Sequence, residues 1–126
     1  MDHAARYQLL DHATDESPLW DARHGIATIV ADGSRIERHR DRTSAELRPE
    51  LERLVRDRHV ELYEMNDRAH RVLGIDEALG VIADETNWHS PNELGASNKR
   101  DTIYALYLTD SGGKEFRQEY AGANPD

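Results

Sequence analysis

The sequence has no cysteine, one phenylalanine and only two lysines among its 16 basic residues. The absence of cysteine excludes disulfide bonds, thiolate metal sites and cysteine nucleophiles. No apolar run approaches the roughly 18 residues of a membrane span. The N-terminal stretch MDHAARYQLL lacks the basic flank and the long apolar segment of a secretory signal. We therefore expect a soluble, cytoplasmic protein that does not enter a membrane.

A length of 126 residues corresponds to one domain, so residues 1–126 are predicted to fold as a single unit. The formal charge is −9, from 25 acidic and 16 basic residues. A domain of this charge repels polyphosphate at long range, which disfavours non-specific binding to DNA or to an anionic membrane. If the protein acts by binding, a protein partner is the favoured expectation.

The clearest pattern is a helix that runs directly into a strand within residues 43–65. Leucine and valine repeat at helical spacing over 47–55, and apolar and polar residues then alternate over 59–65 as in a strand. Pro49 would remove a backbone hydrogen bond and clash with the preceding turn. The regular part of this helix is therefore expected over 48–58.

The residues before this junction predict two further helices and a charged connection. Residues 4–14 should form a short helix. Residues 19–31 carry a helical stripe, but they could equally contain a strand that ends in an Asp-Gly turn. The helix is favoured because Asp21 suits a first turn and Gly33 a C-terminal cap. Residues 34–42 hold one aliphatic side chain and are expected to be an exposed connection or a short helical turn.

The second half of the chain predicts one more helix, one more strand and a C-terminal helix. Residues 66–71 should be a turn or loop, and residues 75–83 an amphipathic helix. The segment 102–108 is apolar on both alternating faces, which suggests a strand that is covered on both sides or paired centrally. The last helix is expected to start at Thr109 or Ser111.

A polar segment of 15 residues, 87–101, separates the predicted inserted helix from the last strand. It is long for a connection in so small a domain, which favours a binding loop. The alternative is that Trp88 closes the core below the preceding helix. The predicted binding residues are Trp88, His89, Asn92, Lys99 and Arg100.

Two segments, PELERLVRDRHVELYE and YALYLTDSGGKEF, carry a family resemblance. The first resembles the recognition helix and first wing strand of winged-helix regulators of the MarR and PadR types. The second is similar to their second wing strand, which enters a helix through a Leu-Thr-x-x-Gly turn. The resemblance covers residues 44–64 and 104–116, roughly a quarter of the chain. Arg58 stands where these domains usually place glycine, and a left-handed backbone there would cost on the order of 1 kcal/mol.

The resemblance implies a small α+β fold with a winged-helix-like build. Three N-terminal helices would precede a two- or three-stranded antiparallel sheet, with an inserted helix in a wing insertion at about 66–101 and a C-terminal helix at the end. For a DNA-binding regulator, it would place Arg48, Arg53 and Arg56 against phosphates or guanine edges. Three glutamates on the same helix would oppose those phosphates.

Catalysis has little support in the sequence. The seven histidines form no HxH or HxxxH pair and no zinc-helix spacing, so we predict neither a metal site nor a cofactor. No serine has histidine and aspartate close by in the chain, although such triads assemble in space.

The favoured function is a non-enzymatic regulatory or protein-interaction module. The alternative is a sequence-specific DNA-binding regulator, and the third hypothesis is a small hydrolase or ligand-binding protein. A homodimer through the terminal helices is a further expectation.

Overall fold

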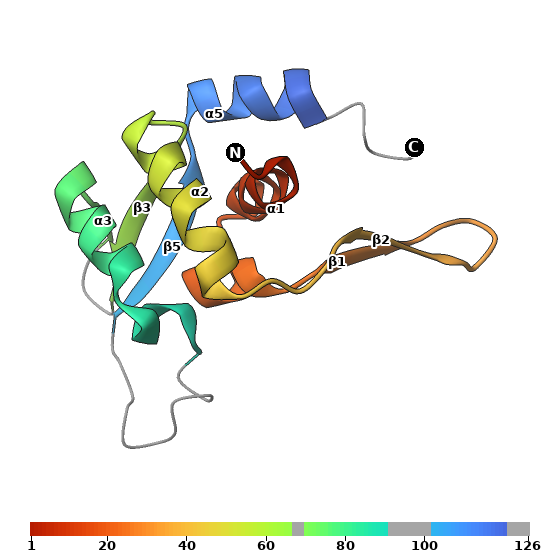
Figure 1. Cartoon of the computed structure of the whole chain (residues 1–126), viewed down its shortest axis with the longest axis horizontal. Helices are drawn as coiled ribbons and strands as arrows, with labels where there is room; N and C mark the ends of the chain where they lie inside the picture. Colours follow the sequence, from red (N-terminus) through yellow and green to blue (C-terminus); the bar gives the residue numbers. More distant parts are fainter. Residues whose placement is uncertain (67–69, 91–101, 121–126) are drawn as a thin grey trace.

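The computed structural model describes residues 1–66, 70–90 and 102–120, which form an α+β fold with two antiparallel sheets (Figure 1). In chain order the elements are α1 (His3–Thr14), the 3-10 helix η1 (Leu19–Arg23), β1 (Ile26–Ile29), β2 (Arg35–His39), α2 (Ser44–Arg56), β3 (Val60–Met65), β4 (His70–Val72), α3 (Ile75–Ala83), the 3-10 helix η2 (Glu85–Trp88), β5 (Ile103–Leu108), α5 (Asp110–Glu115) and the π-helical turn η4 (Phe116–Tyr120). The predicted α+β class is confirmed. Among the described residues, no helix is both long and apolar enough to cross a lipid bilayer.

Helix α2 begins earlier than predicted, and its expected start at residue 48 is wrong. The Thr43 hydroxyl accepts from the Glu46 N–H at 3.2 Å, and the Glu46 carboxylate accepts from the Thr43 N–H at the same distance. This capping box holds the first turn in helical geometry. Pro49 lies inside the helix, where a proline costs roughly 3 kcal/mol, but the fully buried leucines on the inner face of α2 offset that cost.

The segment between α1 and α2 is a hairpin, so the helix predicted over 19–31 and the connection predicted over 34–42 are both wrong. Only η1 is helical there, and β1 pairs antiparallel with β2. The strand alternative was the correct one, because the β-branched residues after Gly25 favour extended backbone. Gly33, at φ +85°, makes the hairpin turn rather than a helix cap. Three predicted N-terminal helices are thus replaced by α1, the short η1, the hairpin and α2.

The larger sheet has the order β4-β3-β5 and is antiparallel throughout. The strands predicted at 59–65 and 102–108 are confirmed as β3 and β5, but β3 is the central strand. β5 lies beside the segment after α1, where the Leu106 N–H donates to the Ser17 carbonyl at 3.0 Å. The predicted inserted helix is α3, and the loop predicted over 66–71 already contains the start of β4.

Helices cover one face of this sheet. Leu62 of β3 faces Leu106 of β5, and both are fully buried beneath α2 and α3. In Figure 1, α2 and α3 lie in front of the sheet, and α5 runs across the end of the molecule near α1. The Arg6 guanidinium of α1 donates to the Glu115 carboxylate of α5 at 2.7 Å, which joins the two ends of the described chain. Within the described residues, the sheet therefore has one face covered by helices and one face without a helix.

The junction between α2 and β3 contains a residue in the left-handed conformation, so the condition stated for Arg58 is met. Arg58 has φ +60°. Its carbonyl oxygen accepts hydrogen bonds from the Thr109 and Ser111 hydroxyls at 2.7 and 3.1 Å. Gly112 packs so closely that a Cβ atom there would lie 1.9 Å from the His59 carbonyl oxygen. The predicted helix start is confirmed, because Thr109 caps α5.

Candidate interaction surface

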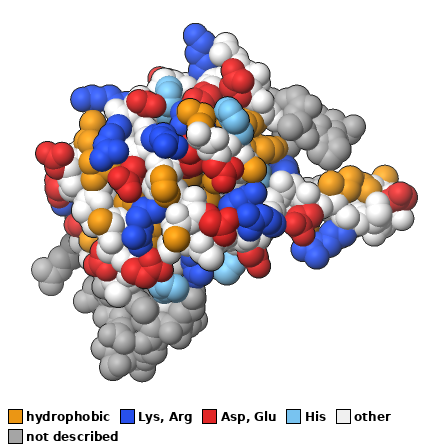
Figure 2. Space-filling model, viewed as in Figure 1, with side chains coloured by type: hydrophobic (Ala, Val, Ile, Leu, Met, Phe, Trp, Pro, Cys, Tyr) orange, Lys and Arg blue, Asp and Glu red, His pale blue; other side chains and the backbone are white. Residues whose placement is uncertain are grey.

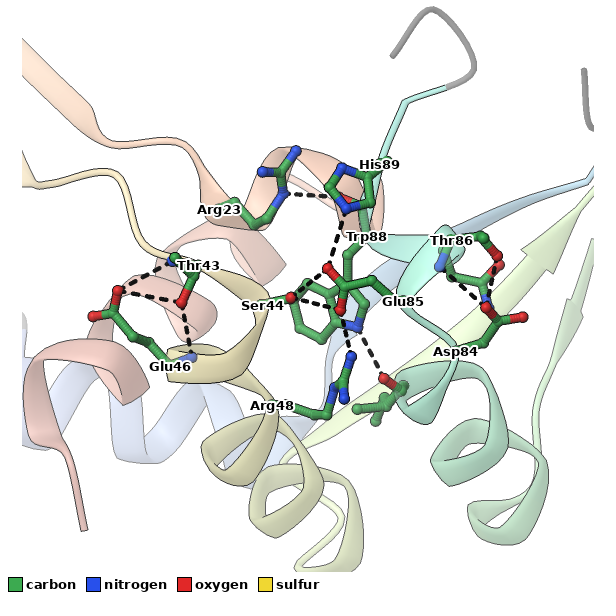
Figure 3. Close-up of polar contacts among 12 residues, drawn as sticks. Arg23, Thr43, Ser44, Glu46, Arg48, Asp84, Glu85, Thr86, Trp88 and His89 are labelled. Carbon is green, nitrogen blue, oxygen red and sulfur yellow. Dashed lines mark hydrogen bonds and ion pairs between the residues drawn. The ribbon is translucent and has the colours of Figure 1, made fainter. Parts of the chain in front are cut away.

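Trp88, the first predicted binding residue, belongs to the core. Its side chain is fully buried, and the indole N–H donates to the Ile82 carbonyl at 2.9 Å. The Arg23 guanidinium donates to the Trp88 carbonyl at 2.7 Å, which ties η1 to η2 (Figure 3). Of the two alternatives for this residue, the structure therefore shows the core one. Trp88 leaves no indole surface for a partner.

Of the other predicted binding residues, the structure describes only His89. His89 lies at the surface, and its Nε2 is 3.1 Å from the Glu85 carboxylate. Asn92, Lys99 and Arg100 lie outside the described residues. The predicted binding role of this segment therefore stays a prediction.

Glu85 is the centre of a polar cluster that sequence reasoning missed (Figure 3). The Ser44 hydroxyl lies 2.7 Å from both of its carboxylate oxygens, and Arg48 donates to one of them at 2.5 Å. The hydrogen bond from Ser44, together with those from His89 and the charge of Arg48, lowers the pKa of Glu85. The carboxylate stands between serine and histidine, so the cluster is not arranged for nucleophilic attack. It links the first turn of α2 to η2.

The three arginines of the DNA-binding alternative are all paired with carboxylates. Arg48 contacts Glu85 as above, Arg53 donates to Glu50, and Arg56 lies 3.6 Å from Glu52. Figure 2 shows basic and acidic side chains interspersed over the helical face of the molecule. Phosphates would have to compete with these carboxylates for the arginines, and the face offers no patch of one charge sign.

One group of side chains has the order of a serine-histidine-acid triad in space: Ser111, His59 and Glu115. The Ser111 hydroxyl oxygen is 3.0 Å from His59 Nδ1, and His59 Nε2 is 3.7 Å from the Glu115 carboxylate. Glu115 accepts two hydrogen bonds from Arg6, which are the main reason that its pKa is lowered. These residues come from three elements, so local sequence spacing held no signal for them.

The hydrogen bonds around Ser111 assign this cluster an anchoring role. Its hydroxyl donates to the Arg58 carbonyl, so the proton is not directed at the imidazole. The N–H groups of Gly112 and Gly113 donate to Thr109, at 3.1 and 2.8 Å, and do not point at a place for an oxyanion. Within the described residues, no three His, Asp or Glu side chains gather in a way that could hold a metal ion.

The face of the three-stranded sheet that carries no helix is unusually apolar. It presents Tyr63 and Met65 of β3, Val72 of β4 and Tyr107 of β5, and we call these four residues the open sheet face. Val72 is 54% exposed and Tyr107 44% exposed. Outward positions of a half-solvated antiparallel sheet are normally polar. Contiguous apolar surface on a protein is typical of an interaction site.

The open sheet face is hollowed and has an acidic rim. A hollow of about 380 Å³ is lined by the four residues together with Glu16, His70 and Arg71. A larger hollow of about 720 Å³ lies between β3, β4, α2 and α3, and Val72 lines both. Burial raises the pKa of Tyr63, and the charge of Glu16 acts in the same direction, so the Glu16 carboxylate lies near this phenol.

A second carboxylate on this side of the sheet adds to the acidic character of the rim. Glu61 lies opposite Tyr107 in the register of β3 and β5. The Arg71 guanidinium does not neutralise the rim, because it is engaged by Glu77 of α3 at 2.9 Å and lies 3.6 Å from Glu64, which faces the helices. The one sequence signal for this face was that residues 102–108 are apolar on both alternating sides.

Comparison with known proteins identifies no relative. No family model matches the chain, and no curated protein and no solved structure is significantly similar to it. The functional conclusion therefore depends on the residues of this chain alone.

Proposed function

We propose that the protein is a non-enzymatic interaction module that binds a partner protein through the open sheet face. The observation that carries the proposal is the apolar lining of this face, with Val72 and Tyr107 exposed and Tyr63 and Met65 half-buried, in a chain that is 33% charged. The core already lies on the other face of the sheet, so these side chains are not needed to fill it. Covering them would remove apolar surface from water at about 25 cal/mol per Å².

The charges around the face indicate the chemistry of the partner. Glu16 and Glu61 border the apolar residues, and the whole chain carries a charge of −9. A partner with apolar or aromatic side chains surrounded by lysine or arginine would be complementary in both respects. The alternative of DNA binding is disfavoured because Arg48, Arg53 and Arg56 are engaged by carboxylates.

The proposal is tested with a variant of the open sheet face and a control on the helical face. V72K/Y107K places two charges on the apolar surface, whereas E52K/R56E exchanges one exposed ion pair of α2 and conserves net charge. Proteins from the source cell that bind the immobilised wild type would be identified, purified and titrated against all three chains. We expect at least tenfold weaker binding to V72K/Y107K, unchanged binding to E52K/R56E, and similar melting temperatures for all.

Two results would contradict the proposal. The first is a partner whose affinity is unaffected by V72K/Y107K, which would place binding elsewhere. The second is micromolar, salt-sensitive binding of the wild type to mixed-sequence duplex DNA at about 50 mM salt. That result would favour the DNA-binding alternative.

A further inference from the structure

The β1–β2 hairpin carries apolar side chains that contribute nothing to the core. Ile26, Ile29, Val30 and Ile36 lie on it, and within the described residues none belongs to the core or to the side chains packed against it. Ile29 is 67% exposed. The hairpin projects from the rest of the molecule (Figure 1), and hydrophobic side chains lie along its projecting part (Figure 2). An isolated two-stranded ribbon is only marginally stable in water, so this arm would gain from further strands.

Contacts at its base hold the arm in its projecting position. Arg38 is the extra residue of a β-bulge in β2, and its guanidinium donates to Asp11 of α1 at 2.7 Å. His39, which is buried, contacts the same carboxylate at 2.7 Å. On the other strand, the Gly25 N–H donates to the Asp41 side chain at 2.7 Å. The base is therefore fixed, while the outer part of the arm is exposed at Ile29 among the described residues.

The two edges of the arm differ in charge. The β1 side, GIATIVA over residues 25–31, has no charged residue and no proline. The β2 side, RIERHR over residues 35–40, is charged at most positions. Charged side chains on an edge strand oppose pairing with another chain, and β2 has this protection. β1 lacks it and is rich in β-branched residues, which makes it a template for strand addition.

The backbone groups on the β1 edge can be assigned from the turn. The Val30 N–H donates to the Ser34 carbonyl at 3.0 Å, and the Val30 carbonyl accepts from the Gly33 N–H at 2.9 Å. Val30 therefore faces β2, and by alternation Thr28 does too. Ala27 and Ile29 direct their N–H and C=O groups to the open edge. In the described part of the chain, no strand pairs with that edge.

We propose that β1 pairs with β1 of a second copy of this chain, antiparallel about a twofold axis at Thr28. The product is a four-stranded sheet in the order β2-β1-β1-β2. Thr28 of one copy faces Thr28 of the other as a non-hydrogen-bonded pair. On either side of the axis, Ala27 of one copy and Ile29 of the other exchange backbone hydrogen bonds. This interface goes beyond the proposed function, because the open sheet face is not part of it.

The outward-facing backbone groups select this register, because it pairs Ala27 of each copy with Ile29 of the other, both within β1. Within the hairpin, Ile29 lies opposite Arg35 and Ala27 lies opposite Glu37. In the joined sheet, the row on the axis therefore has Ile36 at both ends, and each of the two rows beside it has Arg35 of one copy at one end and Glu37 of the other copy at the other end. A register in which Ile29 faces Ile29 would instead place both Arg35 side chains in one row. The outer edges of the joined sheet are the charged β2 strands, so association should stop at two copies.

Single-cysteine variants test the register, because the chain has no cysteine of its own. T28C places two thiols at the axis, about 4.5 Å apart between Cα atoms, a distance that a disulfide can span. The matched control is I36C. Ile36 lies opposite Thr28 on β2, so in the joined sheet the two cysteines of I36C would lie on the two outer strands, roughly 14 Å apart. Under mild oxidation, we expect T28C to form a covalent dimer at least tenfold faster than I36C.

Sedimentation equilibrium tests the association itself without a cysteine. At about 0.15 M salt, which screens repulsion between the two acidic chains, we expect a two-copy mass for the wild type. I29K should reduce the protein to a monomer with an unchanged circular dichroism spectrum, because Ile29 is exposed. The proposal is overturned by a wild type that stays monomeric at roughly millimolar concentration, by equal crosslinking of T28C and I36C, or by filaments of many copies.

Discussion

At the scale of residues, Trp88 and His89 are neighbours in the chain with opposite environments. The indole is fully buried and donates to Ile82, whereas the imidazole lies at the surface beside Glu85. Both are residue types that are common in binding sites. Only burial separates the core residue from the one that a ligand could reach.

Replacement of Trp88 should therefore act on stability. For W88A we expect the free energy of unfolding to fall by about 3–5 kcal/mol, because a large buried side chain leaves a cavity. H89A, at the surface, should change it by less than about 1 kcal/mol. Urea denaturation of both variants checks this. A stable W88A protein that had lost its partner would instead restore the binding-loop hypothesis for residues 87–101.

His12 is a buried histidine with two hydrogen-bond partners. Its Nε2 lies 2.9 Å from the His24 carbonyl, and its Nδ1 lies 3.2 Å from the Ser17 hydroxyl. Burial lowers the pKa of His12, although the hydrogen bond to His24 and the charge of Asp11 act in the opposite direction. The folded protein therefore holds this ring in its neutral form over a wider pH range than the unfolded chain does.

The sign of the pH dependence follows from that difference. As pH falls below about 6.5, the unfolded chain takes up a proton at His12 before the folded protein does, so the folded state loses stability. The free energy of unfolding should fall less between pH 7 and pH 5 in H12Q than in the wild type. H70Q, which changes an exposed residue, should keep the wild-type pH dependence. Equal pH dependence in H12Q and the wild type would show that His12 does not contribute.

At the scale of elements, the α2–β3 junction shows how one strained residue is held by distant parts of the chain. Arg58 adopts a left-handed conformation, which costs a non-glycine residue about 1 kcal/mol. The hydroxyls of Thr109 and Ser111, about 50 residues later in the chain, hold its carbonyl oxygen. The start of α5 therefore fixes the turn that sends the chain from α2 into the sheet.

Glycine should relieve this strain. We expect R58G to raise the free energy of unfolding by up to about 1 kcal/mol, because glycine adopts positive φ without a steric cost. R56G, two residues earlier at the last residue of α2, should lower it, by less than the roughly 1 kcal/mol that glycine costs in a helix interior. Thermal and urea denaturation of the two variants provide the comparison. A loss of stability in R58G as large as that in R56G would show that the left-handed turn carries no strain.

At the scale of the whole molecule, charge and apolar surface are distributed differently. The arginines of α2 are balanced by carboxylates on the same helix and on η2, so the helical face offers no concentrated charge. Apolar surface is exposed at the open sheet face and along the projecting hairpin. For a chain with a net charge of −9, this distribution favours protein partners over nucleic acid.

The elements could be predicted where one periodicity was unambiguous, and they could not where two periodicities shared the same residues. The leucines of α2 and the alternation of β3 indicated their elements correctly. Residues 19–31 fitted both a helical stripe and a strand, because isoleucines and a valine at these spacings satisfy both patterns. The pairing of β1 with β2 makes this segment a strand. That pairing was not predicted, because the charged residues of β2 indicated an exposed connection.

Less of the candidate interaction surface than of the fold could be predicted from the sequence, because this surface depends on contacts between residues far apart in the chain. Ser44 and Glu85 are 41 residues apart, and no local spacing connects them. Tyr63 and Tyr107 share a face only because β3 and β5 are neighbours in a particular register. A shift of one residue would turn one of these tyrosines to the other face.

Composition and local pattern by themselves determined the presence of both helices and strands, the lack of cysteine, the net charge, and the helix-to-strand junction of residues 43–65. These properties depend on residue type and on neighbours within a few positions. The tertiary structure alone decided that Trp88 is core, that the α2 arginines are paired, and that no described element covers one sheet face or pairs with one strand edge. The reason is physical: burial and ion pairing are set by the elements that pack together, and chain proximity does not specify that packing.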